Sequence, residues 1–144
     1  MRWFELFKSK NQDHRKSYLK ELIKVAKADG CLEKREYDFI LVIGQKLACS
    51  ADEIQELSDE IQTDAPPQNR KLRLKLLFDT VAIMLIDGDI DPKELALCKS
   101  IAMKSGFEPE VIDDIVYRIE RLTKSGKSVE EASNEAFEIY SRAE

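Results

Sequence analysis

Two short acidic motifs hold the side chains of this sequence that could do chemistry. Each is an Asp-Gly pair with an apolar residue two positions after the Gly and a Glu six positions after it. Each Asp is expected at the C-terminal end of a helix, where a carboxylate beside unsatisfied carbonyls costs about 0.3–1 kcal/mol. A hard divalent cation (Ca²⁺, Mg²⁺ or Mn²⁺) would remove this conflict, because carboxylates and helix-end carbonyls would hold it together. The candidate metal ligands are Asp29, Glu36, Asp87, Asp89, Asp91 and Glu94.

We call residues 29–36 the first acidic motif and residues 87–94 the second. A helix–turn–helix with no ligand explains part of both, since Gly30 and Gly88 are suited to ending a helix and the apolar residue to plugging the core. An EF-hand calcium loop does not fit, because its first and third positions require Asp or Asn. With the Gly at the sixth position of the loop, the corresponding residues, which lie just before each motif, are apolar or Lys. A weaker, partly hydrated cation site and a solvated acidic turn both remain open.

The helices that must position these motifs follow from the apolar spacing, which predicts an all-α fold of about seven helices and no convincing strand. The first two are expected at about 14–28 and 33–48. Three capping boxes, each with a Glu three positions after the cap, mark the start of later helices at Ser50, Asp91 and Ser128. Asn69 caps the fourth helix, and Pro92 and Pro109 stand at the start of the fifth and sixth. The fourth helix is the most apolar, and we expect it at the centre of the fold.

An internal repeat with an offset of 58 residues relates the two motifs. Each unit is a long helix, an Asp-Gly loop, a second helix, a short turn and a third helix, over about 15–63 and 69–122. One such unit has too little core to stand alone, so we expect two units packed about a pseudo-twofold axis. With a C-terminal helix at about 128–142, residues 1–144 are predicted to form a single domain.

Twin units with this motif resemble the TerB-like domain family, which includes the tellurite-resistance protein TerB and the N-terminal domain of membrane-anchored DnaJ-type co-chaperones. The matching segments are Ala28-Asp29-Gly30-Cys31-Leu32 with Glu36, and Ile86-Asp87-Gly88-Asp89-Ile90-Asp91-Pro92-Lys93-Glu94. The resemblance covers about residues 15–122. It implies an all-helical fold, a cytoplasmic or membrane-proximal location, and an acidic surface that binds metal through Asp29, Glu36, Asp87 and Glu94.

The chain departs from the family pattern at two positions. Cys31 stands where a polar residue is usual, and Ile86 stands where Ala is usual. The first motif is therefore expected to be the poorer set of ligands. No DnaJ segment is present in the sequence, so a co-chaperone role is not carried over.

Composition argues against several classes of protein. The net charge of −5 does not fit a strongly basic nucleic-acid binder. One His (His14) and three scattered Cys, with no CxxC pair, do not fit structural zinc or a disulfide framework, and each Cys is expected to be a small buried hydrophobe. The sequence shows neither an apolar run of about 18 residues that would span a membrane nor a signal peptide, so the reducing cytoplasm is the expected location.

Charge and aromatic residues suggest where a partner could bind. The net charge is +4 over residues 1–30, −6 over 31–64, +4 over 65–75 and −7 over 76–144. The third block is a basic patch, either a solvated face with neighbouring acids or a contact for an anionic partner or lipid surface: Arg70, Lys71, Arg73 and Lys75. The N-terminal apolar residues either cap the core as a short docked helix or touch a partner or a membrane: Trp3, Phe4, Leu6 and Phe7.

We therefore expect a non-enzymatic binding module, connected with stress response or tellurite resistance, whose cofactor would be a divalent cation held by the acidic motifs. The alternative is a protein-interaction scaffold that uses the N-terminal aromatics and the basic patch without a metal. An enzyme would need a nucleophile or base in a cleft, and the sequence marks none. The expected partner is another protein, with a membrane surface as a further contact through Trp3, Phe4 and Phe7, and no nucleic acid is expected.

Overall fold

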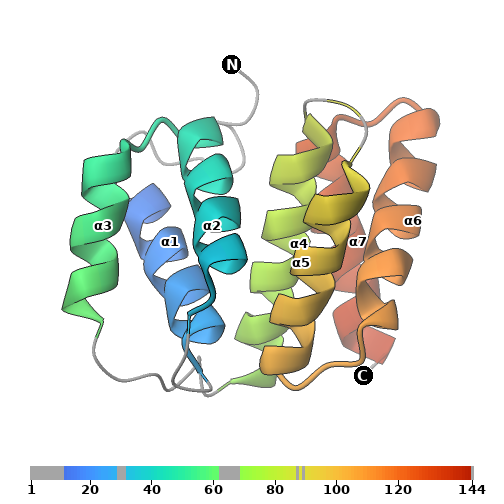
Figure 1. Ribbon diagram of the computed structural model, residues 1–144. Coiled ribbons are helices and arrows are strands. Elements are labelled where there is room, and N and C mark those ends of the chain that lie inside the picture. Colours follow the sequence, from blue (N-terminus) through green and yellow to red (C-terminus); the bar gives the residue numbers. More distant parts are fainter. Residues whose placement is uncertain (1–11, 29–31, 62–68, 87, 89, 144) are drawn as a thin grey trace.

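A computed structural model describes residues 12–28, 32–61, 69–86, 88 and 90–143. Within these residues the chain forms seven α-helices and no strand (Figure 1), which confirms the all-α prediction. The helices are α1 (Gln12–Ala26), α2 (Lys34–Lys46), α3 (Ala51–Glu60), α4 (Arg70–Ile86), α5 (Pro92–Lys104), α6 (Glu110–Lys124) and α7 (Val129–Ala143).

Side-chain caps define where four of the helices begin. Ser50 and Ser128 form the predicted capping boxes, each with hydrogen bonds in both directions to the Glu three positions later. The Asn69 side chain accepts the Lys71 N–H at 2.7 Å at the start of α4. At α5 the prediction of a full box is wrong in one half. The Asp91 side chain accepts the N–H of residue 93 at 2.7 Å, but Glu94 makes no return bond to Asp91 among the described contacts.

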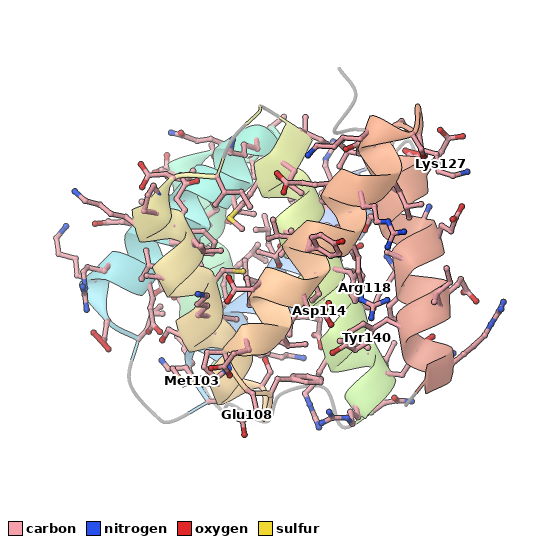
Figure 2. All side chains as sticks on the ribbon, turned by 90° about the vertical axis from the view of Figure 1, so that its right-hand side faces the viewer. Met103, Glu108, Asp114, Arg118, Lys127 and Tyr140 are labelled. Carbon is pink, nitrogen blue, oxygen red and sulfur yellow. The ribbon has the colours of Figure 1, made fainter. Side chains whose placement is uncertain are left out.

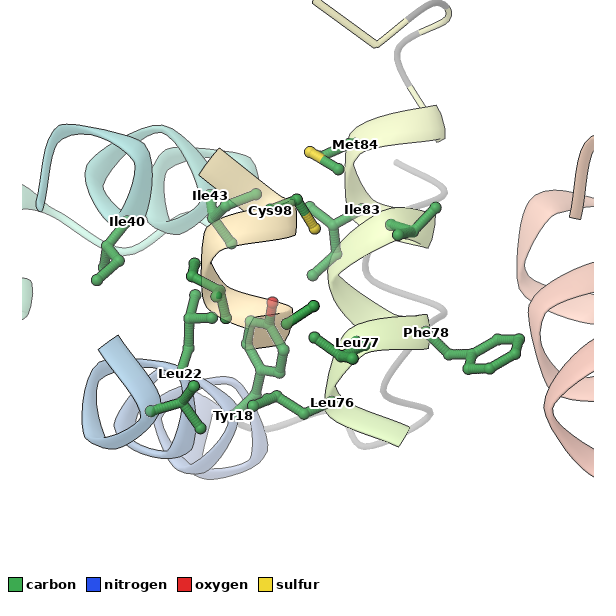
Figure 3. Close-up of a cluster of buried hydrophobic side chains, with 14 of the residues drawn as sticks. Tyr18, Leu22, Ile40, Ile43, Leu76, Leu77, Phe78, Ile83, Met84 and Cys98 are labelled. Atoms are coloured by element: carbon green, nitrogen blue, oxygen red, sulfur yellow. The ribbon is translucent and has the colours of Figure 1, made fainter. Parts of the chain in front are cut away.

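The central helix is α4, as the sequence predicts. It contacts α1, α2, α5, α6 and α7, and most of its side chains from Leu74 to Leu85 are buried. In Figure 3, Leu77 and Ile83 of α4 lie in one cluster with Leu22 of α1 and Ile43 of α2. The core is therefore continuous between α1–α3 and α4–α7.

One buried hydrogen bond ties α1 to α4 within this core. The Thr80 hydroxyl donates to the Leu76 carbonyl at 2.8 Å, so the Tyr18 hydroxyl is the donor in the 2.6 Å bond between Tyr18 and Thr80 Oγ1. Burial raises the pKa of Tyr18 well above its usual value. Cys49 and Cys98 are buried and unpaired, as predicted, and Cys31 lies outside the described residues.

The C-terminal helix α7 packs against α4 and α6. The Phe78 ring of α4 makes edge contacts with the rings of Phe137 and Tyr140, at centroid distances of 5.5 and 5.8 Å. Figure 2 shows Asp114 and Arg118 of α6 close to Tyr140 of α7. Its Nε lies 3.1 Å from the Asp114 carboxylate, and its guanidinium lies 5.0 Å from the Tyr140 ring centroid. These contacts hold α7 against both α4 and α6.

Helices α2 and α5 run in opposite directions across the front of the molecule in Figure 1. Their bounds differ by 58 residues at both ends, which is the repeat offset found in the sequence. The pseudo-twofold relation between complete three-helix units stays a prediction.

Candidate functional site

The described residues include half of the six predicted metal ligands. Glu36 lies in the first turn of α2, Asp91 precedes α5, and Glu94 lies in the first turn of α5. Asp29, Asp87 and Asp89 lie outside the described residues.

The two acidic motifs are placed at opposite ends of the molecule. Helix α2 begins at the lower end in Figure 1 and α5 at the upper end, and Glu36 in the first turn of α2 contacts Lys104, the last residue of α5. Helical rise from Glu94 to Lys104 is about 15 Å, so Glu94 lies roughly that far from Glu36 along the helix axis. These two Glu residues therefore cannot share one cation.

Glu36 is almost completely buried, with 1% of its surface exposed, and its carboxylate already has a cationic partner. Lys104 Nζ lies 2.8 Å from Glu36 Oε1 and donates a second hydrogen bond, of 2.7 Å, to the carbonyl of Ala26, the last residue of α1. Ser100 Oγ donates to Glu36 Oε2 at 3.2 Å, and the Glu33 N–H donates to Oε1 at 3.3 Å.

The Lys104 ammonium thus holds a carboxylate and a helix-end carbonyl together. The sequence predicts a metal ion for such a task at the first motif, and Asp29, whose place at the helix end motivates that prediction, lies outside the described residues. A divalent cation at Glu36 would have to displace this ammonium, so Glu36 is a poor fit for a metal ligand.

The start of α5 differs from the start of α2. Glu94 is half-buried and makes no hydrogen bond or ion pair with any described residue, while the Asp91 carboxylate accepts the N–H of Lys93. No group of three or more His, Cys, Asp or Glu side chains in the described part of the chain is placed to hold a metal ion. Glu94 therefore has no partner among the described residues, unlike Glu36, whereas Asp91 already caps α5.

An open groove of about 710 Å³ runs between α2 and α5 and connects the regions of Glu36 and Glu94. Its α2 side is formed by six residues, and each has its counterpart 58 positions later on the α5 side: Glu33, Arg35, Glu36, Asp38, Phe39 and Val42. The same positions of both predicted units therefore build this surface. Its floor is apolar, from Phe39, Val42 and Leu97.

The charge of the groove is balanced at the start of α2 and acidic at the start of α5. Five acids and two basic residues line it, and Lys104 neutralises one of the acids, Glu36. Asp38 is paired with Lys34 at 3.1 Å, and Glu33 lies 3.8 Å from Arg35. At the start of α5, Asp91 and Glu94 outnumber the one basic lining residue, Lys93.

The sequence analysis did not identify the groove or Lys104. The repeat offset was the available signal for the groove, because shifting residues 33–42 by 58 positions marks the opposite wall. A Lys in the last turn of a helix was the weaker signal for Lys104, since such a side chain also serves its own helix end.

The predicted basic patch is partly engaged within the fold. The Arg70 guanidinium lies 4.2 Å from the Phe107 ring centroid, and Lys75 pairs with Asp79. Burial raises the pKa of Asp79, and the Lys75 ammonium partly offsets this rise. For Lys75, these contacts favour the interpretation of a face with neighbouring acids. The N-terminal aromatics Trp3, Phe4, Leu6 and Phe7 lie outside the described residues.

None of the helices in the described residues has both the length and the apolar character needed to span a membrane. Comparison with protein-family models, curated proteins and solved structures gave no match to this chain. The TerB-like resemblance therefore stays an expectation from the acidic motifs.

Proposed function

We propose that this chain is a non-enzymatic binding module of the TerB-like type, located in the cytoplasm, and that the groove between α2 and α5 is its binding surface. The groove itself carries the proposal. Its volume of about 710 Å³ lies within the range of about 300–1,000 Å³ typical of ligand sites, and it has an apolar floor with charged residues at the rim. A role in stress response or tellurite resistance rests on the resemblance alone.

The proposal is tested by blocking the groove with a large side chain. Ala96 is exposed on the α5 wall, so Ala96→Trp fills the groove without entering the core. The matched control is Ala51→Trp, at an exposed position that starts α3 and does not line the groove. The probes are three amphipathic helical peptides with the same apolar stripe and basic, acidic or uncharged flanks.

The readout is the change in backbone amide NMR shifts of the labelled protein. At least one peptide should shift amides of residues 33–42 and 91–100, and Ala96→Trp should abolish the shifts while Ala51→Trp keeps them. Failure of all three peptides, or shifts that Ala96→Trp leaves unchanged, would refute the groove as the binding surface.

A second candidate function is divalent-cation binding at the second acidic motif. The observation that favours it is Glu94, whose carboxylate has no cationic partner among the described residues, whereas the equivalent Glu36 holds Lys104. In this proposal Asp91 and Glu94 act together with Asp87 and Asp89, and the first motif contributes little.

Calorimetric titration with calcium, magnesium and manganese tests cation binding. Heat at millimolar or tighter affinity should be lost in Asp87→Ala and Glu94→Gln, and kept in Glu110→Gln, which removes a first-turn acid from α6. Absence of heat, or heat unchanged in Asp87→Ala, would dismiss the cation. The scaffold alternative predicts instead that deleting residues 1–8 abolishes capture of a partner while the fold remains intact.

A further inference from the structure

We propose that the N-terminal segment of this chain, residues 1–11, docks in the α2–α5 groove and competes there with an external partner. This inference rests on the proposed function, because it assumes that the groove is a binding surface. It adds a regulator of that surface that belongs to the same chain. The segment itself lies outside the described residues, and the structure places α1, the helix that follows it.

Helix α1 begins at the same end of the molecule as α5. The last residue of α5, Lys104, donates a hydrogen bond of 2.7 Å to the carbonyl of Ala26, the last residue of α1, so the two helices end side by side. Both begin at the upper end in Figure 1, where Asp91 and Glu94 stand at the start of the groove. Eleven residues reach at most about 36 Å, which exceeds the length of about 26 Å of α4, the longest described helix. The groove is therefore within reach of the segment.

The segment carries aromatic side chains that gain from burial against the apolar floor of the groove. Phe7 stands four positions after Trp3 and three after Phe4, so the three rings would share one face of a helix. Each aromatic side chain removes about 150–250 Å² from water when it is covered. Three such rings supply the apolar stripe that a groove between two helices accepts.

The charges of the segment match the acidic end of the groove. Residues 1–11 have a net charge of +2, and Lys8 and Lys10 stand next to α1. These lysines would therefore lie nearest to the start of α5, where Asp91 and Glu94 outnumber one lysine. At the start of α2 the lining acids are each paired with Lys or Arg, so that end adds little attraction or repulsion. The tether and the charges thus set one direction, with the rings extending toward the start of α2.

Two smaller hollows beside α1 fit this segment less well. The hollow of about 220 Å³ between α1 and α4 contains Glu21 and Asp79, and each is paired with a lysine of its own helix. The hollow of about 370 Å³ between α1 and α3 has one apolar lining residue, Leu57. The α2–α5 groove combines an apolar floor with the carboxylate of Glu94, which has no partner among the described residues.

Tethering makes even weak docking of the segment effective. A segment joined to its site by a short linker has an effective concentration of about 1 mM. With an intrinsic Kd of about 0.1 mM, it would fill about nine-tenths of the grooves and weaken an external ligand about tenfold. Loss of the segment should therefore raise the affinity for an external peptide by about that factor.

Trp3 is the only tryptophan of the chain, so acrylamide quenching of its fluorescence reports whether the segment is docked. Quenching in the natural chain should be at least about threefold weaker than in a free peptide of the segment, since about nine-tenths of the chains are docked. Glu94→Lys and Ala96→Arg place a cation in the groove and should remove this protection. The matched controls are Glu110→Lys, in the first turn of α6, and Ala51→Arg, at the start of α3, and both should keep it.

The competition is measured by fluorescence anisotropy with the three labelled amphipathic peptides that test the groove. Deleting residues 1–8 should tighten binding of a peptide about tenfold relative to the full chain. The double variant Phe4→Ser/Phe7→Ser keeps the length of the chain and should give a similar rise. Circular dichroism checks that each variant remains folded.

The possible results separate this inference from the proposed function. Trp3 quenched as strongly in the natural chain as in the free segment would overturn the docking. Protection that Glu94→Lys and Ala96→Arg leave unchanged would place the segment elsewhere on the fold and overturn it as well. Peptides that bind the groove equally in the natural and the shortened chain would overturn the competition and leave the proposed function intact. If no peptide bound either chain while Glu94→Lys exposed Trp3, the external partner would be refuted and the segment would remain the occupant.

Discussion

The buried pair of Glu36 and Lys104 offers a direct test of how the first acidic motif is satisfied. Lys104→Met keeps a long side chain in place but removes the ammonium. It leaves a carboxylate with 1% of its residue exposed, together with the Ala26 carbonyl, without their shared donor. Removing one partner of a buried ion pair costs about 3–5 kcal/mol, a large share of a total stability of about 5–15 kcal/mol.

The expected loss can be measured by urea unfolding and by thermal melting. For a chain of this length about 4 kcal/mol corresponds to a fall in Tm of roughly 8–16 °C. The control within the same helix is Lys99→Met, which removes the exposed ion pair of Lys99 with Asp113 and should cost less than about 1 kcal/mol. Both variants are compared at equal pH and salt.

A double-mutant cycle separates the ion pair from simple loss of packing. In Glu36→Gln/Lys104→Met no unpaired charge is buried. The loss in the free energy of unfolding of the double variant should therefore be about 1–3 kcal/mol smaller than the sum of the losses in the two single variants. Additive losses, or a Lys104→Met variant no less stable than Lys99→Met, would refute the assignment of Lys104 as the cation of the first motif.

Three single substitutions and one pH dependence of stability give further predictions. Ala48 ends α2 with φ of 61°, and Gly106 ends α5 with φ of 89°, so Ala48→Gly should stabilise the fold by about 1 kcal/mol and Gly106→Ala should destabilise it by about as much, as measured by urea unfolding. A Cβ on Gly44 would lie 2.2 Å from Ile54 Cδ1, so Gly44→Ala should cost about 1–3 kcal/mol, and Ile54→Val should recover part of it. Burial raises the pKa of Cys98 from about 9 to about 12, so the unfolded chain loses this proton first as pH rises. The stability advantage of the natural chain over Cys98→Ala should shrink by about 1.4 kcal/mol by about pH 10.

Each of the following results would contradict one of these predictions. A destabilised Ala48→Gly would mean that the helix end does not need a left-handed residue. An unchanged difference between the natural chain and Cys98→Ala across the pH range would contradict the burial of the thiol.

Most of the helix boundaries could be predicted because their causes lie within a few residues. The Ser50 and Ser128 boxes and the Asn69 cap satisfy N–H groups two or three positions away, and Pro92 stands at the first position of α5. The prediction of a capping box at Asp91 was half wrong, and the reason also lies within a few residues. The Asp side chain meets the N–H two positions on, and Glu94 makes no return bond to it.

The candidate site could be predicted less well because its contacts cross the chain. Lys104 lies 68 residues from Glu36, and no local pattern shows that α5 ends where α2 begins. Helices α2 and α5 contact each other and α4, and they run antiparallel, so the two acidic motifs lie at opposite ends of the molecule. The groove follows from the same packing, since its walls come from segments 58 residues apart.

The positive charge beside the end of α1 and Glu36 comes from a side chain of the protein itself, and metal binding at the first motif stays a prediction. A helix-end carbonyl and a nearby carboxylate do need positive charge between them, and at Ala26 and Glu36 a lysine side chain from α5 provides it. The repeat does not extend this solution to Glu94, which has no cationic partner among the described residues. Two motifs that are alike in sequence therefore differ in their contacts: Glu36 of the first joins α1, α2 and α5, and Glu94 of the second has no partner among the residues that the structure describes. Ligand experiments on this protein should accordingly begin at the start of α5, with Glu36 variants read out as changes in stability.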